Sequence, residues 1–300
     1  MNPPRLEFIH CTAPVPHRMG YWEWGDPAAA HTVLCVHGLT RQGRDFDVLA
    51  QTLVERAGGQ VRVLCPDVVG RGKSEFLADP QGYQLPTYVA DMLQLLAHTK
   101  PQTLDWVGTS MGGLIGMLLC AYAPTVGVTV RRLVLNDVGP VIEWAALQRI
   151  GQYLGKSGTF ESVQQAADAM WAISSSFGPH TPAQWLALTE PMLKPVRTAQ
   201  GEAAYALHYD PAIAQAFGAT TPEQAQRGET FLWQAYDAIT ARTLLLRGAE
   251  SDLLSRATAL QMTQRGPRAQ LLEFAGVGHA PTLVDPRQTV VVADFLLPVS

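Results

Sequence analysis

The sequence has few charged residues for its length, and it has no excess of basic ones. Of the 300 residues 16% are charged, and 22 Lys and Arg against 26 Asp and Glu give a formal net charge of −4. Without a basic surface or a run of Lys and Arg, binding to nucleic acid or to an anionic membrane is not expected. We therefore expect the partner of this chain to be a small molecule.

Cysteine is also scarce, and long apolar runs are absent. The most apolar stretch, 112–123, is about twelve residues long, against roughly twenty for a membrane-spanning helix. The first ten residues lack the basic end and apolar run of a signal peptide. Four cysteines show no Cys-x-x-Cys spacing, and three lie in apolar stretches: Cys11, Cys35, Cys65 and Cys120. This pattern indicates buried thiols in a reducing compartment and predicts a cytoplasmic protein.

What the sequence does contain is a regular alternation of apolar runs and helical periodicity. Continuous runs predict strands at 32–36, 61–65, 104–107, 133–135, 243–246 and 270–274. Apolar residues without alternation are typical of strands that are buried on both faces of a parallel sheet. Between the runs, segments such as 86–96 place their apolar residues on one helical face. We predict an α/β fold with a mostly parallel sheet, helices on both faces and ligands at the carboxyl ends of the strands.

The alternation is interrupted by a long segment with helical periodicity and many prolines. We predict a first part of the core at 1–138, a helical cap insertion at 139–236 and a second part of the core at 237–300. The insertion carries four of the seven tryptophans. Aromatic residues at helical spacing usually form packed core, but Trp144 and Trp171 are candidates for contact with a substrate.

The strongest local motif is Gly108-Thr109-Ser110-Met111-Gly112, between a predicted strand and an apolar helix. A nucleophile elbow has this arrangement, because its serine sits in a strained strand-to-helix turn where flanking glycines avoid a Cβ clash. The alternative is a glycine-rich turn with a capping serine. The strand before the motif and the helix after it favour Ser110 as a nucleophile.

A serine nucleophile needs a histidine base, and the base needs a carboxylate that orients it. His279 follows the last predicted strand in a turn sequence, where it can reach back over the sheet. Asp252 follows the strand at 243–246 and is our expected acid. Glu250, two residues earlier, and Asp137, at the end of another strand, are alternatives that the residues alone leave open.

An oxyanion hole requires two backbone NH donors. One is expected from Met111, directly after the nucleophile. The other is expected from Leu39, in the His37-Gly38-Leu39-Thr40 loop that follows the strand at 32–36. Read alone, His37-Gly38 is equally consistent with a tight turn.

Taken together, these motifs resemble the α/β-hydrolase superfamily over nearly the whole chain, in its serine esterase type with a helical cap. The matching motifs are His37-Gly38, Pro66-Asp67-Val68-Val69-Gly70-Arg71-Gly72-Lys73-Ser74, the elbow at Ser110, the Asp252 segment and Gly278-His279. The resemblance implies an eight-stranded sheet, a cap after the sixth strand, and no metal or organic cofactor. Relatives that open epoxides or remove halide carry Asp at the elbow, so Ser110 disfavours those reactions.

These residues predict hydrolysis of a small carboxylic ester, lactone or activated carbonyl through an acyl-enzyme. A carbon–carbon bond hydrolase, an acyltransferase or a non-catalytic fold-mate that binds a small ligand are the alternatives. Gly72-Lys73-Ser74 resembles the end of a phosphate-binding loop, but position 67, where its first glycine should be, is Asp67. The histidines show no metal-binding spacing, so neither a nucleotide nor a metal is expected.

Overall fold

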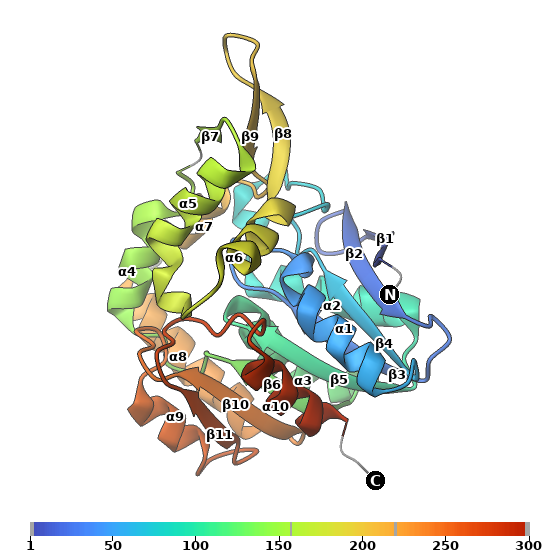
Figure 1. The fold of residues 1–300 in the computed structure, drawn as a ribbon. Coiled ribbons are helices and arrows are strands. Elements are labelled where there is room, and N and C mark those ends of the chain that lie inside the picture. The colour runs from blue at the N-terminus through green and yellow to red at the C-terminus, as the bar shows by residue number, and fades with distance from the viewer. Residues whose placement is uncertain (1–2, 157, 219–220, 298–300) are drawn as a thin grey trace.

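A computed structural model describes residues 3–156, 158–218 and 221–297 of the chain (Figure 1). Its main sheet has eight strands in the order β1-β2-β4-β3-β5-β6-β10-β11. β2 pairs antiparallel with β1 and with β4, and the other neighbours are parallel. The mostly parallel sheet of the expected fold class is therefore confirmed. The strands are β1 Arg5–Cys11, β2 His17–Gly25, β3 His31–Val36, β4 Val61–Pro66, β5 Thr103–Thr109, β6 Val130–Asn136, β10 Arg242–Gly248 and β11 Gln270–Phe274.

Helices cover both faces of this sheet. On one face α1, Asp47–Arg56, packs against α10, Pro286–Leu296. On the other face α3, Met111–Tyr122, packs against α2, Leu85–Thr99, and α8, Pro222–Asp237. The next helix along the chain is α9, Arg256–Met262.

The two faces explain why the strands read as continuous apolar runs. Neighbouring side chains of a strand point to opposite faces. In β3, Val33 and Cys35 belong to the core beneath α1 and α10, whereas Leu34 and Val36 belong to the core beneath α2 and α3. All four side chains are fully buried, so these consecutive positions are all apolar.

The segment between β6 and β10 contains helices, as expected, but also a small sheet. Its helices are α4 Trp144–Tyr153, α5 Val163–Ser174, α6 Pro182–Thr189, α7 Ile213–Gly218 and α8. β7 Thr159–Phe160, β9 Ala203–Leu207 and β8 Leu193–Arg197 form a three-stranded antiparallel sheet, and the β8–β9 hairpin projects from the segment in Figure 1. The expectation of a purely helical insertion is wrong in this respect. β8 alternates between inward and exposed residues, so it lacks the continuous apolar run by which the other strands were found.

The N-terminal strands β1 and β2 also lie outside the predicted runs. They form an antiparallel hairpin at the edge of the sheet, where one side remains partly exposed, so that polar residues interrupt the apolar ones. Short 3-10 turns connect several elements, at Gly43–Phe46, Pro80–Gly82, Ala123–Val126, Ser175–Phe177 and Glu190–Met192. Over the described ranges, no helix is both long enough and apolar enough to cross a membrane.

Candidate active site

Ser110 lies between β5 and α3, at the carboxyl end of the parallel strands. Its backbone has φ 51° and ψ −117°, a conformation that is strained for a residue with a side chain. A Cβ on Gly112 would lie 1.9 Å from the Val36 carbonyl oxygen, and one on Gly108 would lie 2.3 Å from that of Gly112. The two glycines are therefore required by the close approach of α3 to the sheet, and the turn has the geometry of a nucleophile elbow.

His279 and Asp137 extend a line of hydrogen bonds from this serine. His279 Nε2 lies 3.0 Å from Ser110 Oγ, and His279 Nδ1 lies 2.7 Å from Asp137 Oδ2. Asp137 is fully buried, while 12% of the His279 side chain is exposed. The Asp137 carboxylate also accepts hydrogen bonds from the Gly248 NH and the Ser251 hydroxyl, at 2.8 and 2.6 Å. A buried carboxylate fixed in this way can hold the imidazole in the tautomer that leaves Nε2 free to accept a proton.

The expectation that Asp252 contacts His279 is wrong. The Asp252 side chain is half exposed and pairs with Arg149 of α4, at 2.7 and 2.9 Å. The sheet register explains the difference, because Thr109 of β5 pairs with Asn136 of β6. Ser110 directly follows Thr109, and Asp137 directly follows Asn136. Ser110 and Asp137 therefore lie at the ends of neighbouring strands.

Glu250, the other alternative, supports the histidine loop without contacting the histidine. Its carboxylate accepts the backbone NH groups of Gly276 and Val277 at 3.1 and 2.7 Å. The Glu250 NH in turn donates to the Val277 carbonyl. The loop that carries His279 is therefore attached to the end of β10.

The His37-Gly38-Leu39 loop passes directly over the elbow. A Cβ on Gly38 would lie 3.7 Å from the Ser110 Cβ, and Leu39 borders the same space as Ser110. Met111 begins α3, so its NH belongs to the first turn, where helical NH groups lack a partner one turn earlier. Both residues that are expected to supply oxyanion donors thus lie beside the serine.

His37 fixes the shape of this loop. Its Nδ1 lies 2.7 Å from the Gly38 carbonyl, and its Nε2 accepts the Val68 NH at 2.9 Å. Complete burial lowers the pKa of His37 to about 3, so the ring is neutral at physiological pH. The Gly38 carbonyl then requires the proton on Nδ1, which agrees with an Nε2 that accepts.

Arg71 belongs to one of the family motifs, but its role could not be inferred from the sequence. Its side chain is fully buried, with Nε donating to the Leu39 carbonyl at 2.8 Å and Nη1 donating to the Val69 carbonyl at 2.7 Å. Its Nη2 also lies 3.6 Å from the Met111 sulfur. One guanidinium therefore contacts both residues that are expected to hold the oxyanion. A positive charge near this position favours negative charge on a bound substrate.

Two pockets meet at Ser110. The smaller one, about 320 Å³, is bordered by His279 and is called here the His279-side pocket. The larger one, about 1040 Å³, is bordered by Met111 and is called the Met111-side pocket. Trp144 lines the Met111-side pocket. Trp171 borders neither pocket, because it packs edge-on against Trp185 with ring centroids 4.9 Å apart.

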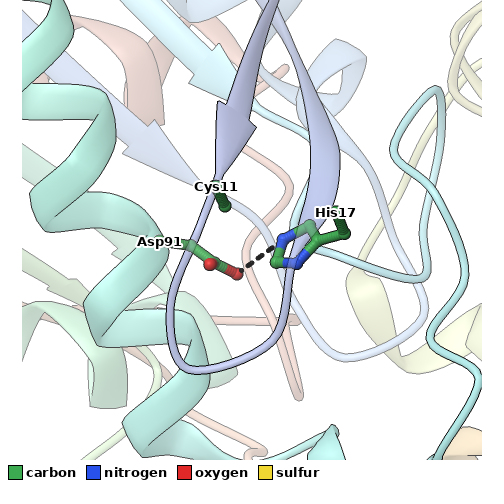
Figure 2. A group of neighbouring side chains, drawn as sticks. All are labelled: Cys11, His17 and Asp91. Carbon is green, nitrogen blue, oxygen red and sulfur yellow. Dashed lines mark ion pairs between the residues drawn. The ribbon is translucent and has the colours of Figure 1, made fainter.

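One group of side chains in the described part of the chain has the composition of a metal site. Cys11, His17 and Asp91 are all buried, with possible ligand atoms within 4.8 Å of one another (Figure 2). Burial raises the pKa of the Cys11 thiol far above its usual range, and burial also raises the pKa of Asp91. Burial opposes charge on His17, but its contact with Asp91 at 3.2 Å raises its pKa.

A protonated thiol is a poor metal ligand. The His17–Asp91 pair instead links the β1–β2 hairpin to α2. None of the three side chains borders either pocket, so this cluster is separate from the site at Ser110.

Comparison with known proteins indicates one family for this chain. Residues 33–293 match the alpha/beta hydrolase family. The 3-hydroxybutyrate-oligomer hydrolase of Cupriavidus necator is 48% identical over 293 residues, which cover 97% of this chain and 97% of that protein. The 2-hydroxymuconate semialdehyde hydrolase of a Pseudomonas species is 29% identical, over 78% of this chain and 76% of that protein.

Solved structures lead to the same family. A crystal structure of an alpha/beta hydrolase from Novosphingobium aromaticivorans is 34% identical and superposes over the full length of both chains with a TM-score of 0.83. The family match covers most of the chain, and the Cupriavidus relative covers nearly all of it. The chain therefore belongs to the α/β-hydrolase family, as a carboxylic ester hydrolase.

Proposed function

We propose that this enzyme hydrolyses short hydroxy-acid esters, with oligomers of 3-hydroxybutyrate as the substrate class, through a triad of Ser110, His279 and Asp137. The observation that carries the proposal is the line of hydrogen bonds from Asp137 through His279 to Ser110. It offers a nucleophile, a base and an orienting carboxylate that are joined by hydrogen bonds.

The reaction takes two steps. His279 Nε2 takes the Ser110 proton while the serine oxygen bonds to the ester carbonyl carbon, and the Leu39 and Met111 NH groups stabilise the oxyanion. The carbon–oxygen bond of the ester then breaks, and His279 gives the proton to the leaving alkoxide. Water attacks the acyl-enzyme with the same assistance, releasing the acid and restoring Ser110.

The substrate class rests on two lines of support. The 48% identical relative is named for hydrolysis of 3-hydroxybutyrate oligomers. The two pockets on either side of Ser110 also suit an ester with substantial groups on both its acyl and alcohol sides. Segment 139–236, which supplies α4 and Trp144, acts in this proposal as a lid that selects substrates.

The 29% identical relative makes carbon–carbon bond hydrolysis the second candidate, since its name refers to 2-hydroxymuconate semialdehyde. Both reactions use the same triad, and only the group that leaves differs. Four buried free thiols suit a reducing compartment, so the cytoplasm is the proposed location.

The test is hydrolysis of the 3-hydroxybutyrate dimer, compared with 2-hydroxymuconate semialdehyde at equal concentration. We expect kcat/KM for the dimer to be higher by at least about a hundredfold. Ser110→Ala should lose about six orders of magnitude in kcat and should no longer react with a fluorophosphonate probe. Ser175→Ala, at an exposed position that borders neither pocket, is the control and should keep both properties.

Two results would overturn the proposal. If the semialdehyde is turned over faster than the dimer, the enzyme is a carbon–carbon bond hydrolase and the proposed substrate class is wrong. If folded Ser110→Ala retains activity, or the probe labels another residue, the nucleophile is wrong.

A further inference from the structure

The two pockets at Ser110 differ in charge. The His279-side pocket is bordered by the basic side chains Arg41, Arg149 and Lys156 and, among the residues that are described, by one carboxylate, Asp45. In the described part of the chain, the Met111-side pocket is bordered by two carboxylates, Glu143 and Glu229, and by no basic side chain. A substrate with one anionic end would therefore bind in one direction.

Two of the three basic side chains are already paired. Arg41 contacts Asp45 through Nε and Nη2, at 2.6 and 2.7 Å. Arg149 contacts Asp252 through the same two nitrogens. Among the residues that the structure describes, no carboxylate lies within ion-pair distance of Lys156, so its charge remains to meet a ligand.

Lys156 also has a defined place in the pocket wall. It follows α4, and its NH donates to the Tyr153 carbonyl at 3.1 Å. The preceding Gly155 NH donates to the Tyr209 hydroxyl at 3.1 Å. Tyr153 and Tyr209 border the same pocket, so the ammonium is carried by backbone that is hydrogen-bonded to the pocket wall.

The position of His279 tells which part of a substrate occupies this pocket. In ester cleavage the histidine donates its proton to the leaving alkoxide. His279 borders the His279-side pocket and not the other, so the alcohol portion of the ester belongs there. In a hydroxy-acid oligomer, the free carboxylate belongs to the alcohol portion of the last ester bond.

We propose that Lys156 binds the free carboxylate of the substrate, so that the enzyme removes hydroxy acids one at a time from the carboxyl end of an oligomer. This inference rests on the proposed function. Ser110 Oγ bonds to the carbonyl carbon of the penultimate unit, and the ester bond to the last unit breaks. That unit takes the proton from His279 and leaves as a free hydroxy acid, while the remaining acyl chain lies in the larger Met111-side pocket until water releases it.

The first experiment compares the 3-hydroxybutyrate dimer with its methyl ester, which has the same scissile bond but no carboxylate. Lys156→Met should raise KM for the acid about tenfold. This is the lower end of the range for losing a contact with a charged group, and it applies because the lysine is exposed in the free protein. The kcat for the acid and both constants for the methyl ester should change less than about twofold. Lys156→Arg should restore most of the affinity for the acid.

The matched control is Lys100→Met, which removes the same charge at an exposed position. Lys100 ends α2 just before β5, at the opposite end of the strand from Ser110, so neither substrate should be affected. A second experiment uses a trimer labelled with ¹³C in its carboxyl-terminal unit. Under single-turnover conditions, the label should appear first in free 3-hydroxybutyrate.

The outcomes separate the inference from the proposed function. If both dimer substrates are hydrolysed but Lys156→Met affects them equally, or the label stays in the dimer product, the inference is overturned and the function stands. If neither dimer substrate is hydrolysed while short aryl esters are, the proposed substrate class fails and the inference fails with it.

Discussion

Replacing Asp137 by Asn tests the site most directly, because every neighbour of its carboxylate is a hydrogen-bond donor. Oδ2 accepts from His279 Nδ1 and the Ser251 hydroxyl, and Oδ1 accepts from the Gly248 NH. An Asn side chain has one acceptor oxygen and one NH₂ group. In either orientation, its NH₂ group therefore faces a donor.

The consequence for the histidine depends on where that NH₂ group lies. At the Oδ2 position it would donate to Nδ1, which moves the imidazole proton to Nε2. An Nε2 that carries a proton cannot accept one from Ser110. In a serine protease the equivalent change lowers kcat about 10⁴-fold. This factor corresponds to an increase of about 5.5 kcal/mol in the activation barrier.

We expect Asp137→Asn to lose about four orders of magnitude in kcat on p-nitrophenyl acetate. Its free energy of unfolding should fall by about 1–3 kcal/mol, because a buried donor is left without its acceptor. Chemical denaturation would show that the variant is still folded under assay conditions. The rate of fluorophosphonate labelling should fall together with kcat, since both reactions need a deprotonated Ser110.

Asp252→Asn is the matched comparison, because it makes the same chemical change at a half-exposed position. Its pair with Arg149 is worth at most about 1 kcal/mol, so kcat on p-nitrophenyl acetate should change less than about threefold. The reasoning would be refuted if Asp252→Asn lost several orders of magnitude while Asp137→Asn kept near-normal turnover.

Three further predictions concern the loop, the elbow and the lid. Burial lowers the pKa of His37 to about 3, so protonation of this histidine below about pH 6.5 favours the unfolded state, and the free energy of unfolding should drop by about 2 kcal/mol between pH 8 and pH 5. Chemical denaturation of His37→Asn should show a shallower pH dependence. An unchanged pH dependence would contradict His37 as the cause. Gly112→Ala should lower the free energy of unfolding by about 3 kcal/mol, because the new Cβ clashes with the sheet. Gly228→Ala, in α8 with open space around it, should raise the free energy of unfolding by about 0.5–1 kcal/mol. Equal melting temperatures of the two variants would show that the elbow can relax. Trp144→Ala should change the ranking of p-nitrophenyl esters of different acyl chain length by kcat/KM. Trp171→Ala should lower stability and keep that ranking. If Trp144→Ala changed kcat/KM equally for every ester, Trp144 would not belong to the substrate site.

Local patterns were sufficient to identify the central sheet and the candidate nucleophile. A strand that is covered on both faces is apolar at most positions, and this is visible without any partner, as in β3 and β5. The buried Asp105 of β5 is an exception, because it is paired with His31 and Arg131. The elbow is also local, because its glycines and its serine lie within five consecutive residues. The strands that sequence reasoning missed, β1, β2, β7, β8 and β9, belong to antiparallel hairpins or ribbons whose partial exposure interrupts the apolar pattern.

By itself the sequence determined the fold class, the candidate nucleophile and the candidate base, because each depends on patterns that are local along the chain. Which carboxylate lies against the candidate base was decided only by the tertiary structure. Three carboxylates follow strands in the sequence, and what distinguishes Asp137 is that β6 lies next to β5, with Asn136 opposite Thr109. The same holds for Arg71 and Lys156, which are brought near Ser110 only by the loops and helices that fold around it. Strand order and register bring together residues that are far apart in the chain, and no local pattern records that pairing.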